Sequence, residues 1–330
     1  MMKKTPIFLP VSCRRGTAIL LTALLLTGCG GSSAKPATQA SPPAGADSTA
    51  ESAPTVGTRD STPQALVPQM DASATYGNDL VQINDSYSQD GYIQIDYVGT
   101  NEKVKMQITT PGGTVYTYTL HDPGSFETFP LTGGDGPYIV KVFEHVQDTQ
   151  YSTAYTTSID VTLADEFSPY LYPNQYVNFS PGDAAVAKGQ ELVLPSNTDL
   201  DVVTNVYNYI IKNITYDQEK ADTVKSGYLP VPDETLATGK GICFDYAALM
   251  ATMLRTQRIP TRLEIGYSGT AYHAWVSVYI TDVGWLNGII EFDGHDWELI
   301  DPTLGANNSG EDRIRSYIGD GSNYEMQYVY

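Results

Sequence analysis

The spacing of hydrophobic residues changes near residue 166, and this change limits which folds the chain can adopt. Between about 80 and 165, apolar and polar residues alternate in short stretches such as "YIQIDYV" and "KVKMQIT". A period of two indicates half-buried β-strands. The stretches are interrupted by "PGG" at 111–113 and "GGDGP" at 133–137, which are typical of turns. This pattern predicts a small antiparallel β-sandwich of the immunoglobulin-like kind over residues 76–165.

After residue 166 the hydrophobic period becomes helical. Six apolar residues fall on one helix face, and Thr198 is placed to cap its start. They are Leu200, Val203, Tyr207, Ile210, Ile211 and Ile214. A short helix near "DETLAT" and a longer one from Cys243 to Leu254 follow, and then the strand candidates "RLEIGY", "AYHAWVSVYI", "GIIEF" and "WELID". Helices followed by consecutive strands predict an α+β domain with an antiparallel sheet over residues 166–330, and the tyrosine-rich end predicts a final strand.

The first 28 residues have the features of an export signal. Four basic residues and no acidic one precede the apolar run "AILLTALLL", which is too short to span a bilayer. The ending "LTGC" resembles a bacterial lipobox, which implies cleavage before Cys29 and a lipid on Cys29. An ordinary signal peptide cut nearby would instead release the protein. We expect an extracytoplasmic protein that contacts the membrane only through this N-terminal lipid.

Residues 29–75 have the composition of a flexible tether. They are rich in Ser, Thr, Ala, Pro and Gly and hold almost no large apolar side chains. Such a segment cannot bury enough surface to offset the entropy that ordering the chain would cost. The sequence therefore predicts a spacer that holds the following domains away from a membrane.

The charge of the chain excludes two classes of partner. Residues 1–28 contain four of the 19 basic side chains and none of the 38 acidic ones, so the rest of the chain has a formal net charge of −23. A protein this acidic is repelled by nucleic acid and by anionic lipid headgroups. We expect neither as a partner.

Cysteine is rare, which makes the position of Cys243 informative. The other two cysteines are Cys13, in the signal segment, and Cys29, at the predicted lipidation site. Cys243 would then be the only thiol of the mature protein, where it is a buried inert side chain, an intermolecular partner or a reactive group. No second cysteine or close histidine pair accompanies it, so we expect no metal and no cofactor.

Three residues far apart in the sequence form a candidate catalytic set. Cys243 follows "GKG" at a helix start, where unpaired backbone N–H groups favour the thiolate form, and the two glycines allow a substrate backbone to approach. His273 stands near the start of a strand, and Asp301 ends "WELID". Adjacent antiparallel strands would set Asp301 beside His273 to orient its imidazole. A nucleophile, a base and an orienting group together predict acyl transfer.

The stretches "GKGICFDYAALMATMLRTQRIPTRLEIGY", "YHAWVSVYI" and "WELIDPTLG" resemble, in order and spacing, the core of the transglutaminase-like superfamily of papain-like cysteine enzymes. The resemblance covers about residues 200–305. It implies Cys243 as nucleophile, His273 as general base and acid, and Asp301 as the residue that orients His273. It also implies an oxyanion donor upstream of the cysteine, for which Tyr216 is the candidate; a core tyrosine is the alternative interpretation.

The predicted function is amide acyl transfer through a thioester on Cys243. If water resolves the thioester, the protein is a peptidase or amidase; if a lysine amine does so, it is a cross-linking transglutaminase. We expect hydrolysis, because a short domain does not readily exclude water. The expected substrate is a protein or peptide, with cell-wall peptides as one possibility. The competing hypothesis is a non-catalytic binding or structural lipoprotein.

Overall fold

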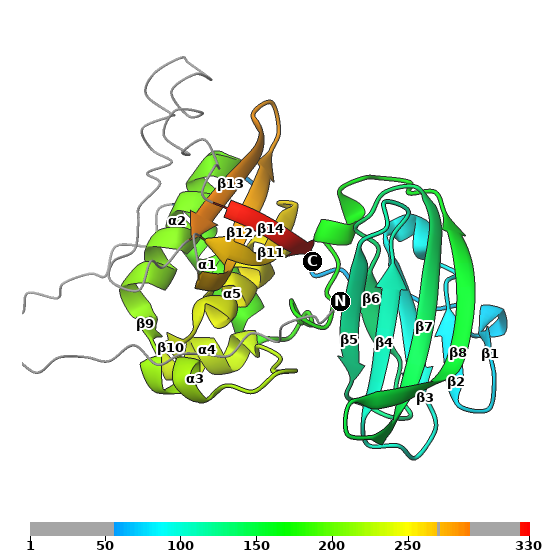
Figure 1. Ribbon diagram of the computed structural model, residues 1–330. Helices are drawn as coiled ribbons and strands as arrows, with labels where there is room; N and C mark the ends of the chain where they lie inside the picture. The colour runs from blue at the N-terminus through cyan, green and yellow to red at the C-terminus, as the bar shows by residue number, and fades with distance from the viewer. Residues whose placement is uncertain (1–55, 269–270, 291–323) are drawn as a thin grey trace, which may run out of the picture. The chain divides into compact units, whose positions relative to one another are not determined.

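Two four-stranded sheets precede a helical region that carries a third four-stranded sheet (Figure 1). The computed structural model describes residues 56–268, 271–290 and 324–330, which all belong to one compact unit. The strand and helix order confirms a mixed α+β chain with its β-sheets before the helices. An immunoglobulin-like sandwich and the boundaries at 76–165 and 166–330 stay predictions.

The first two sheets have the strand orders β1-β2-β3-β6 and β5-β4-β7-β8, and all of their neighbouring strands are antiparallel. The strands are β1 (Tyr76–Gly77), β2 (Val81–Asn84), β3 (Tyr92–Tyr97), β4 (Val104–Thr109), β5 (Val115–Leu120), β6 (Glu127–Pro130), β7 (Gly136–Gln147) and β8 (Gln150–Val161). Short 3-10 helices lie at η1 (Ala72–Ala74), η2 (Ser88–Asp90) and η3 (Ser168–Tyr170).

Alternation predicts burial correctly in β4 but not in β3. In β4, Val104, Met106 and Ile108 are buried while Lys105 is exposed. In β3 every residue is buried, including Gln94 and Asp96, which a half-buried strand would expose. A buried carboxylate needs a donor, and the Asp96 carboxylate accepts a hydrogen bond from the Gly124 backbone N–H at 2.8 Å. The prediction of a half-buried β3 is therefore wrong.

The helical region begins with α1 and α2 and ends with α5, and short strands and helices lie between α2 and α5. Thr198 caps α2 as predicted, because its side chain accepts from the Asp201 backbone N–H. The pattern of the sequence gave no indication of α1 or α3. The elements are α1 (Ala184–Val193), α2 (Asp199–Asn213), β9 (Thr215–Tyr216), α3 (Gln218–Thr223), α4 (Pro232–Thr238), β10 (Lys240–Gly241) and α5 (Cys243–Arg255).

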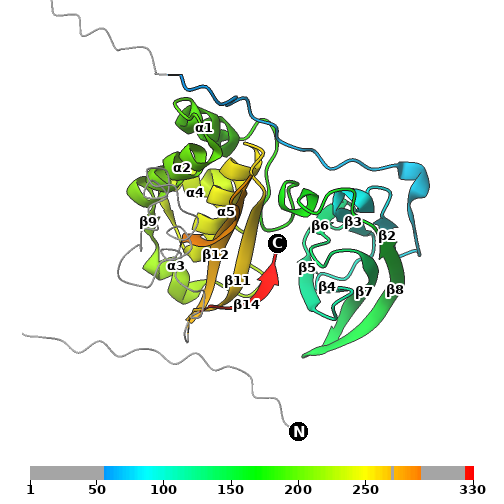
Figure 2. The same ribbon diagram turned by 90° about the horizontal axis from the view of Figure 1, so that it is seen from above.

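The third sheet is antiparallel with the order β13-β12-β11-β14. Its strands are β11 (Thr261–Ser268), β12 (Ala271–Ile280), β13 (Gly284–Ile290) and β14 (Tyr324–Val329), so the predicted final strand is confirmed. Helices α1, α2, α4 and α5 gather on one side of this sheet, with α5 against β11 and β12 (Figure 2). None of the helices in the described ranges is long and apolar enough to cross a membrane.

Part of the predicted tether is held in place by polar contacts. The Gly57 and Gln64 backbone N–H groups donate to the carbonyls of Leu194 and Thr256, both at 2.7 Å. The Arg59 guanidinium forms an ion pair with Asp199 at 2.6 Å. The amino-acid composition of this segment shows only that it has few apolar side chains to bury, so it could not indicate these polar contacts. Residues 57–64 are therefore fixed on the helical region, whereas 29–55 lie outside the described residues.

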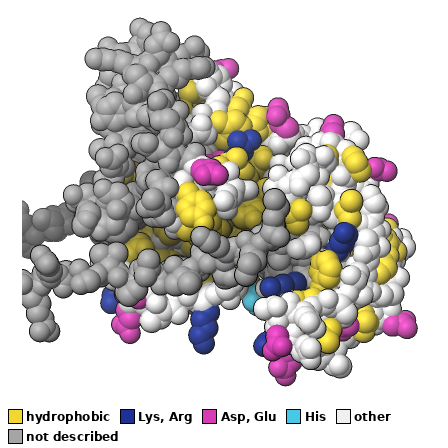
Figure 3. All heavy atoms as spheres, viewed as in Figure 1, with side chains coloured by type: hydrophobic (Ala, Val, Ile, Leu, Met, Phe, Trp, Pro, Cys, Tyr) yellow, Lys and Arg dark blue, Asp and Glu magenta, His cyan; other side chains and the backbone are white. Residues whose placement is uncertain are grey.

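Acidic side chains are spread over the visible face of the described residues. Figure 3 shows them at separate positions, with Lys and Arg between some of them, rather than in one continuous patch. The charge predicted from the sequence is thus distributed on this face.

Candidate functional site

Cys243 is the first residue of α5 and is a half-buried free thiol. The preceding residue, Ile242, has extended backbone angles and forms the helix N-cap position. The first N–H groups of a helix have no partner inside the helix, so they stabilise a negative charge beside them. The structure thus confirms the predicted placement of the cysteine at a helix start.

A buried carboxylate fixes this helix start. Asp245 has 0 % exposure, and its carboxylate accepts hydrogen bonds from the Ile242 backbone N–H at 2.8 Å and from the Tyr228 hydroxyl at 2.6 Å. The Lys220 ammonium pairs with the same carboxylate at 2.8 Å and donates to the Tyr228 hydroxyl at 2.6 Å. Burial and the bond to Asp245 raise the pKa of Tyr228, which keeps its hydroxyl protonated. We call these four residues the Asp245 network.

The glycines before Cys243 have structural roles, and the close approach of a substrate backbone stays a prediction. Gly239 ends α4 with a φ of 62°, a left-handed angle that glycine adopts without strain. At Gly241 a Cβ atom would lie 2.6 Å from the Cβ of Asp245, so a side chain there would displace the network. Lys240, between them, is exposed and lies on β10.

Tyr216 lies beside the peptide that leads into Cys243. Strands β9 and β10 are parallel, with Tyr216 opposite Gly241, and the Asp217 N–H donates to the Gly241 carbonyl at 2.9 Å. Burial raises the pKa of Tyr216 to about 12, and the charge of Cys243 contributes to the rise. The phenol is therefore protonated near neutral pH and is close enough to Cys243 to interact with its charge.

His273 lies on β12, opposite Gly266 of β11, and is 9 % exposed. Strand β11 starts beside the C-terminal end of α5, where the Arg255 guanidinium donates to the Thr261 carbonyl at 3.0 Å. Helix α5 packs on β11 and β12, the two strands that contain Gly266 and His273.

Glu264 was missed by the sequence analysis and lies near His273 on the same face of the sheet. It faces Trp275 across the β11–β12 pair, and its carboxylate accepts from the Trp275 indole at 2.6 Å and the Ser277 hydroxyl at 2.8 Å. Its side chain is only 4 % exposed, and burial raises the pKa of this carboxyl despite the two donors. A glutamate in a run of strand residues gave no sign of burial.

Replacing Glu264 with glutamine is expected to stabilise the protein at high pH. The pKa of Glu264 is higher in the folded than in the unfolded state, so stability falls as pH rises through the range between these values. Glutamine keeps an acceptor for Trp275 and Ser277 but carries no charge. The midpoint temperature of thermal unfolding should therefore be higher for E264Q than for the wild type at pH 8. The difference in midpoint temperature should vanish below about pH 4. The control is Glu102→Gln, because Glu102 is exposed. If the unfolding temperatures of both variants depended on pH in the same way, the expectation would be contradicted.

Two other predicted residues lie outside the described residues. They are Asp301, the proposed partner of His273, and Cys29, the proposed lipidation site. Within the described ranges, no three His, Cys, Asp or Glu side chains are grouped so that they could hold a metal ion. The structure thus brings Tyr216 and Cys243 together and places His273 on a strand that contacts α5, while the grouping of His273 and Asp301 with Cys243 stays a prediction.

Residues 186–288 match the family model described as the transglutaminase-like superfamily. The match contains Tyr216, Cys243 and His273 but ends before Asp301, and it covers less than a third of the chain. The chain therefore carries a transglutaminase-like domain, preceded by β-sheets that the family model does not include.

Other similarities are more distant. A stretch of 138 residues is 28 % identical to the UPF0252 protein MJ1282 of Methanocaldococcus jannaschii, and it covers 38 % of each chain. The chain thus spans less than two fifths of the length of that relative. "A Putative Cysteine Protease from Cytophaga hutchinsonii" is 17 % identical, with 72 % of this chain and 83 % of that chain covered and a TM-score of 0.34. Red sea bream transglutaminase is 15 % identical, with 64 % and 48 % covered and a TM-score of 0.23.

Proposed function

We propose that the protein is a transglutaminase-like cysteine enzyme that transfers acyl groups from amide bonds. The observation that carries this proposal is the position of Cys243, at the first residue of a helix anchored by a buried carboxylate, within the region that matches the superfamily model. In the proposed set, Cys243 is the nucleophile, His273 is the general base and acid, and Asp301 orients His273.

The proposed reaction has two balanced steps. The Cys243 thiolate attacks the amide carbonyl carbon and forms a C–S bond; the C–N bond then breaks, and the His273 imidazolium gives its proton to the departing amine. A thioester and a neutral imidazole remain. His273 next removes a proton from the incoming water or amine, whose attack on the thioester carbonyl releases the Cys243 sulfur.

Tyr216 is the proposed second donor to the oxyanion that forms in both steps. The support is its place opposite Gly241 and its raised pKa, which keeps the phenol protonated and able to donate. The Cys243 backbone N–H would be the first donor. Oxyanion donors act most strongly in a site that excludes water, and Tyr216 is half-buried.

Water is the proposed acceptor, which makes the protein a peptidase or amidase. A cross-linking transglutaminase must let an amine reach the thioester before water does, which requires a closed channel. The proposed substrate is a protein or peptide, with cell-wall peptides as one possibility. We place the protein outside the cytoplasm, anchored by a lipid on Cys29. The immunoglobulin-like sandwich of residues 76–165 is proposed as a separate domain.

The proposal is tested by the pH dependence of Cys243 alkylation. Iodoacetamide reacts with thiolate, so the wild-type protein should be alkylated at Cys243 well below the roughly pH 8.5 at which a free cysteine becomes half ionised. His273→Ala should slow the reaction near pH 6 by about tenfold, and Asp301→Asn by a smaller factor. Peptide mapping by mass spectrometry assigns the label to Cys243. An inert thiol, or identical profiles for all three proteins, would favour the non-catalytic lipoprotein instead.

A further inference from the structure

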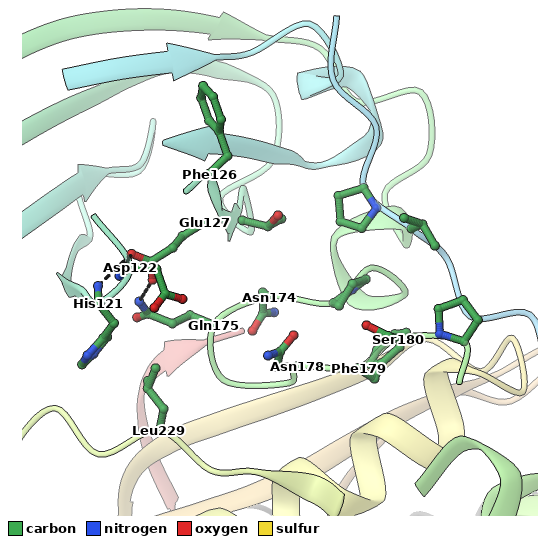
Figure 4. A pocket seen from close by; sticks show the side chains of 15 residues that line it. His121, Asp122, Phe126, Glu127, Asn174, Gln175, Asn178, Phe179, Ser180 and Leu229 are labelled. Carbon is green, nitrogen blue, oxygen red and sulfur yellow. Dashed lines mark hydrogen bonds between the residues drawn. The ribbon is translucent and has the colours of Figure 1, made fainter. Parts of the chain in front are cut away.

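A pocket of about 300 Å³ is lined by none of Tyr216, Cys243 and His273. It is lined by the loop after β5, by the segment between η3 and α1, by Pro68 and by Leu229 of the α3–α4 loop (Figure 4). In this view, Phe126 and Leu229 stand on opposite sides of the amide side chains of Asn174, Gln175 and Asn178. The pocket thus combines apolar walls with amide groups.

Two buried polar atoms of residues that line the pocket have no hydrogen-bond partner among the described residues. They are Nδ2 of Asn174, a donor, and Oε1 of Gln175, an acceptor. The side chains are 4 % and 9 % exposed. Unsatisfied buried polar atoms are rare because each costs free energy. A pair of such atoms lining one pocket therefore points to a ligand that supplies both partners.

The orientation of both amides is fixed by their other bonds. Oδ1 of Asn174 accepts from the backbone N–H groups of Tyr176 and Val177 at 2.9 and 3.0 Å, which leaves the NH₂ group as the free end. Nε2 of Gln175 donates to the Thr119 carbonyl and to the Glu127 carboxylate, both at 2.7 Å, which leaves the oxygen as the free end. Exchanging N and O in either amide would break two bonds, so the donor and the acceptor are correctly assigned.

The charge of the pocket selects against anions. Asp122 and Glu127 line it, and its lining contains no Lys or Arg. Glu127 already accepts from Gln175 and from the His121 N–H at 2.8 Å, whereas Asp122 is exposed. A bound molecule with a positive group beside Asp122 would gain attraction, while a carboxylate would be repelled.

We propose that this pocket binds a peptide segment through one amide group, with a basic side chain directed toward Asp122. The amide carbonyl accepts from Asn174, the amide N–H donates to Gln175, and the apolar walls cover the aliphatic part of the segment. The peptide amide is the common group that presents an acceptor and a donor on opposite sides of one plane. This binding site does not depend on the proposed catalysis and is tested without it.

The test measures binding of small peptide-like probes to the full-length protein by ligand-observed NMR titration. The probes are N-acetyl-lysine N-methylamide, its alanine and glutamate counterparts, and butylamine, which has a positive charge but no amide. The lysine probe should bind most tightly, the alanine probe less tightly, and the glutamate probe at least about tenfold more weakly than the lysine probe. Butylamine should show no saturable binding.

Two variants each remove one free atom but keep the structural bonds of the side chain. Asn174→Asp retains the oxygen that accepts from Tyr176 and Val177, and those two donors hold it ionised. Its added negative charge alone would strengthen binding of the lysine probe, so a weakening of about tenfold reports the lost donor. Gln175→Lys still donates to Thr119 and Glu127 but has no acceptor, and the neutral alanine probe should bind about tenfold more weakly.

The controls place the same charge changes at exposed positions, Asn287→Asp and Gln147→Lys, which should leave binding unchanged. A thermal unfolding measurement checks that every variant is folded. If one of the two pocket variants is unfolded, binding to the other variant still tests the proposal. The proposal is overturned if neither the lysine nor the alanine probe binds the wild type. It is also overturned if butylamine binds as tightly as the lysine probe, or if the pocket variants bind like their controls.

Discussion

Replacing Cys243 with alanine is expected to abolish acyl transfer while leaving the protein folded. With p-nitrophenyl acetate, the wild type should release p-nitrophenol in a rapid burst of one equivalent, because the thiolate takes up the acetyl group before it turns over. C243A has no other group at this position that can form the thioester. The acylation rate should therefore fall by about 10⁴-fold or more, as it does when a catalytic nucleophile is removed.

The measurement combines burst kinetics with intact-mass spectrometry. The wild type should gain one acetyl group on Cys243 during the burst, and C243A should gain none. Cys243→Ser is the matched control, since it keeps a nucleophile of similar size that is much less ionised, and it should acylate slowly. His273→Ala should keep the thiol but lose the rapid burst. A burst of unchanged rate and amplitude in C243A would exclude Cys243 as the nucleophile.

The elements around Cys243 were predictable because local spacing determines them. In α2 the period of 3.6 residues and the cap at Thr198 both lie within one short window, and the structure confirms them. The start of α5 at Cys243 follows from the break at "GKG" and the apolar run after it. Such features depend only on residues that are close together in the sequence, so one sequence is enough to predict them.

The contacts that hold the site were not predictable, because they join residues distant in the sequence. Its position places Asp245 in the first turn of α5, where an acidic residue stabilises the helix dipole. Its partners Lys220 and Tyr228 lie on another helix and in a loop, and nothing in their own surroundings indicates a buried carboxylate. An aspartate three residues after the N-cap position was the available signal, since it is the residue that bonds back to the cap.

The pocket shows the same limit in a segment without regular structure. Asn174 and Gln175 belong to the stretch between η3 and α1, where the spacing of hydrophobic residues gives no information about structure. Their burial depends on Thr119 of β5 and Glu127 of β6, about 50 residues earlier in the chain. Sequence patterns therefore predicted the helix start at Cys243 but not the residues that line this pocket.

Replacing Asp245 with alanine is expected to cause the largest loss of stability of any single change near the site. The variant would leave the Ile242 N–H and the Tyr228 hydroxyl without their acceptor, and the Lys220 ammonium, 26 % exposed, without its counter-charge. Removing one partner of a buried ion pair costs about 3 kcal/mol or more. The free energy of unfolding, measured with urea, should fall by about this amount.

The matched control is Asp199→Ala. Asp199 is also an aspartate in a first helical turn with a basic partner, Arg59, but its side chain is 36 % exposed, compared with 0 % for Asp245. Exposed ion pairs contribute about 1 kcal/mol or less. If burial causes the difference, D245A should lose at least twice as much stability as D199A, and equal losses would contradict the role of the Asp245 network.

A double-mutant cycle then separates the ion pair from the hydrogen bonds. Lys220→Met removes the charge but keeps an aliphatic side chain, and the D245A/K220M variant should be more stable than the sum of the single losses predicts, because no unpaired ammonium remains. The coupling should be about 1 kcal/mol or more. Additive losses would instead assign the stabilisation to the bonds from Ile242 and Tyr228. In both cases D245A should also slow alkylation of Cys243, since the helix start that presents the thiol has lost its anchor.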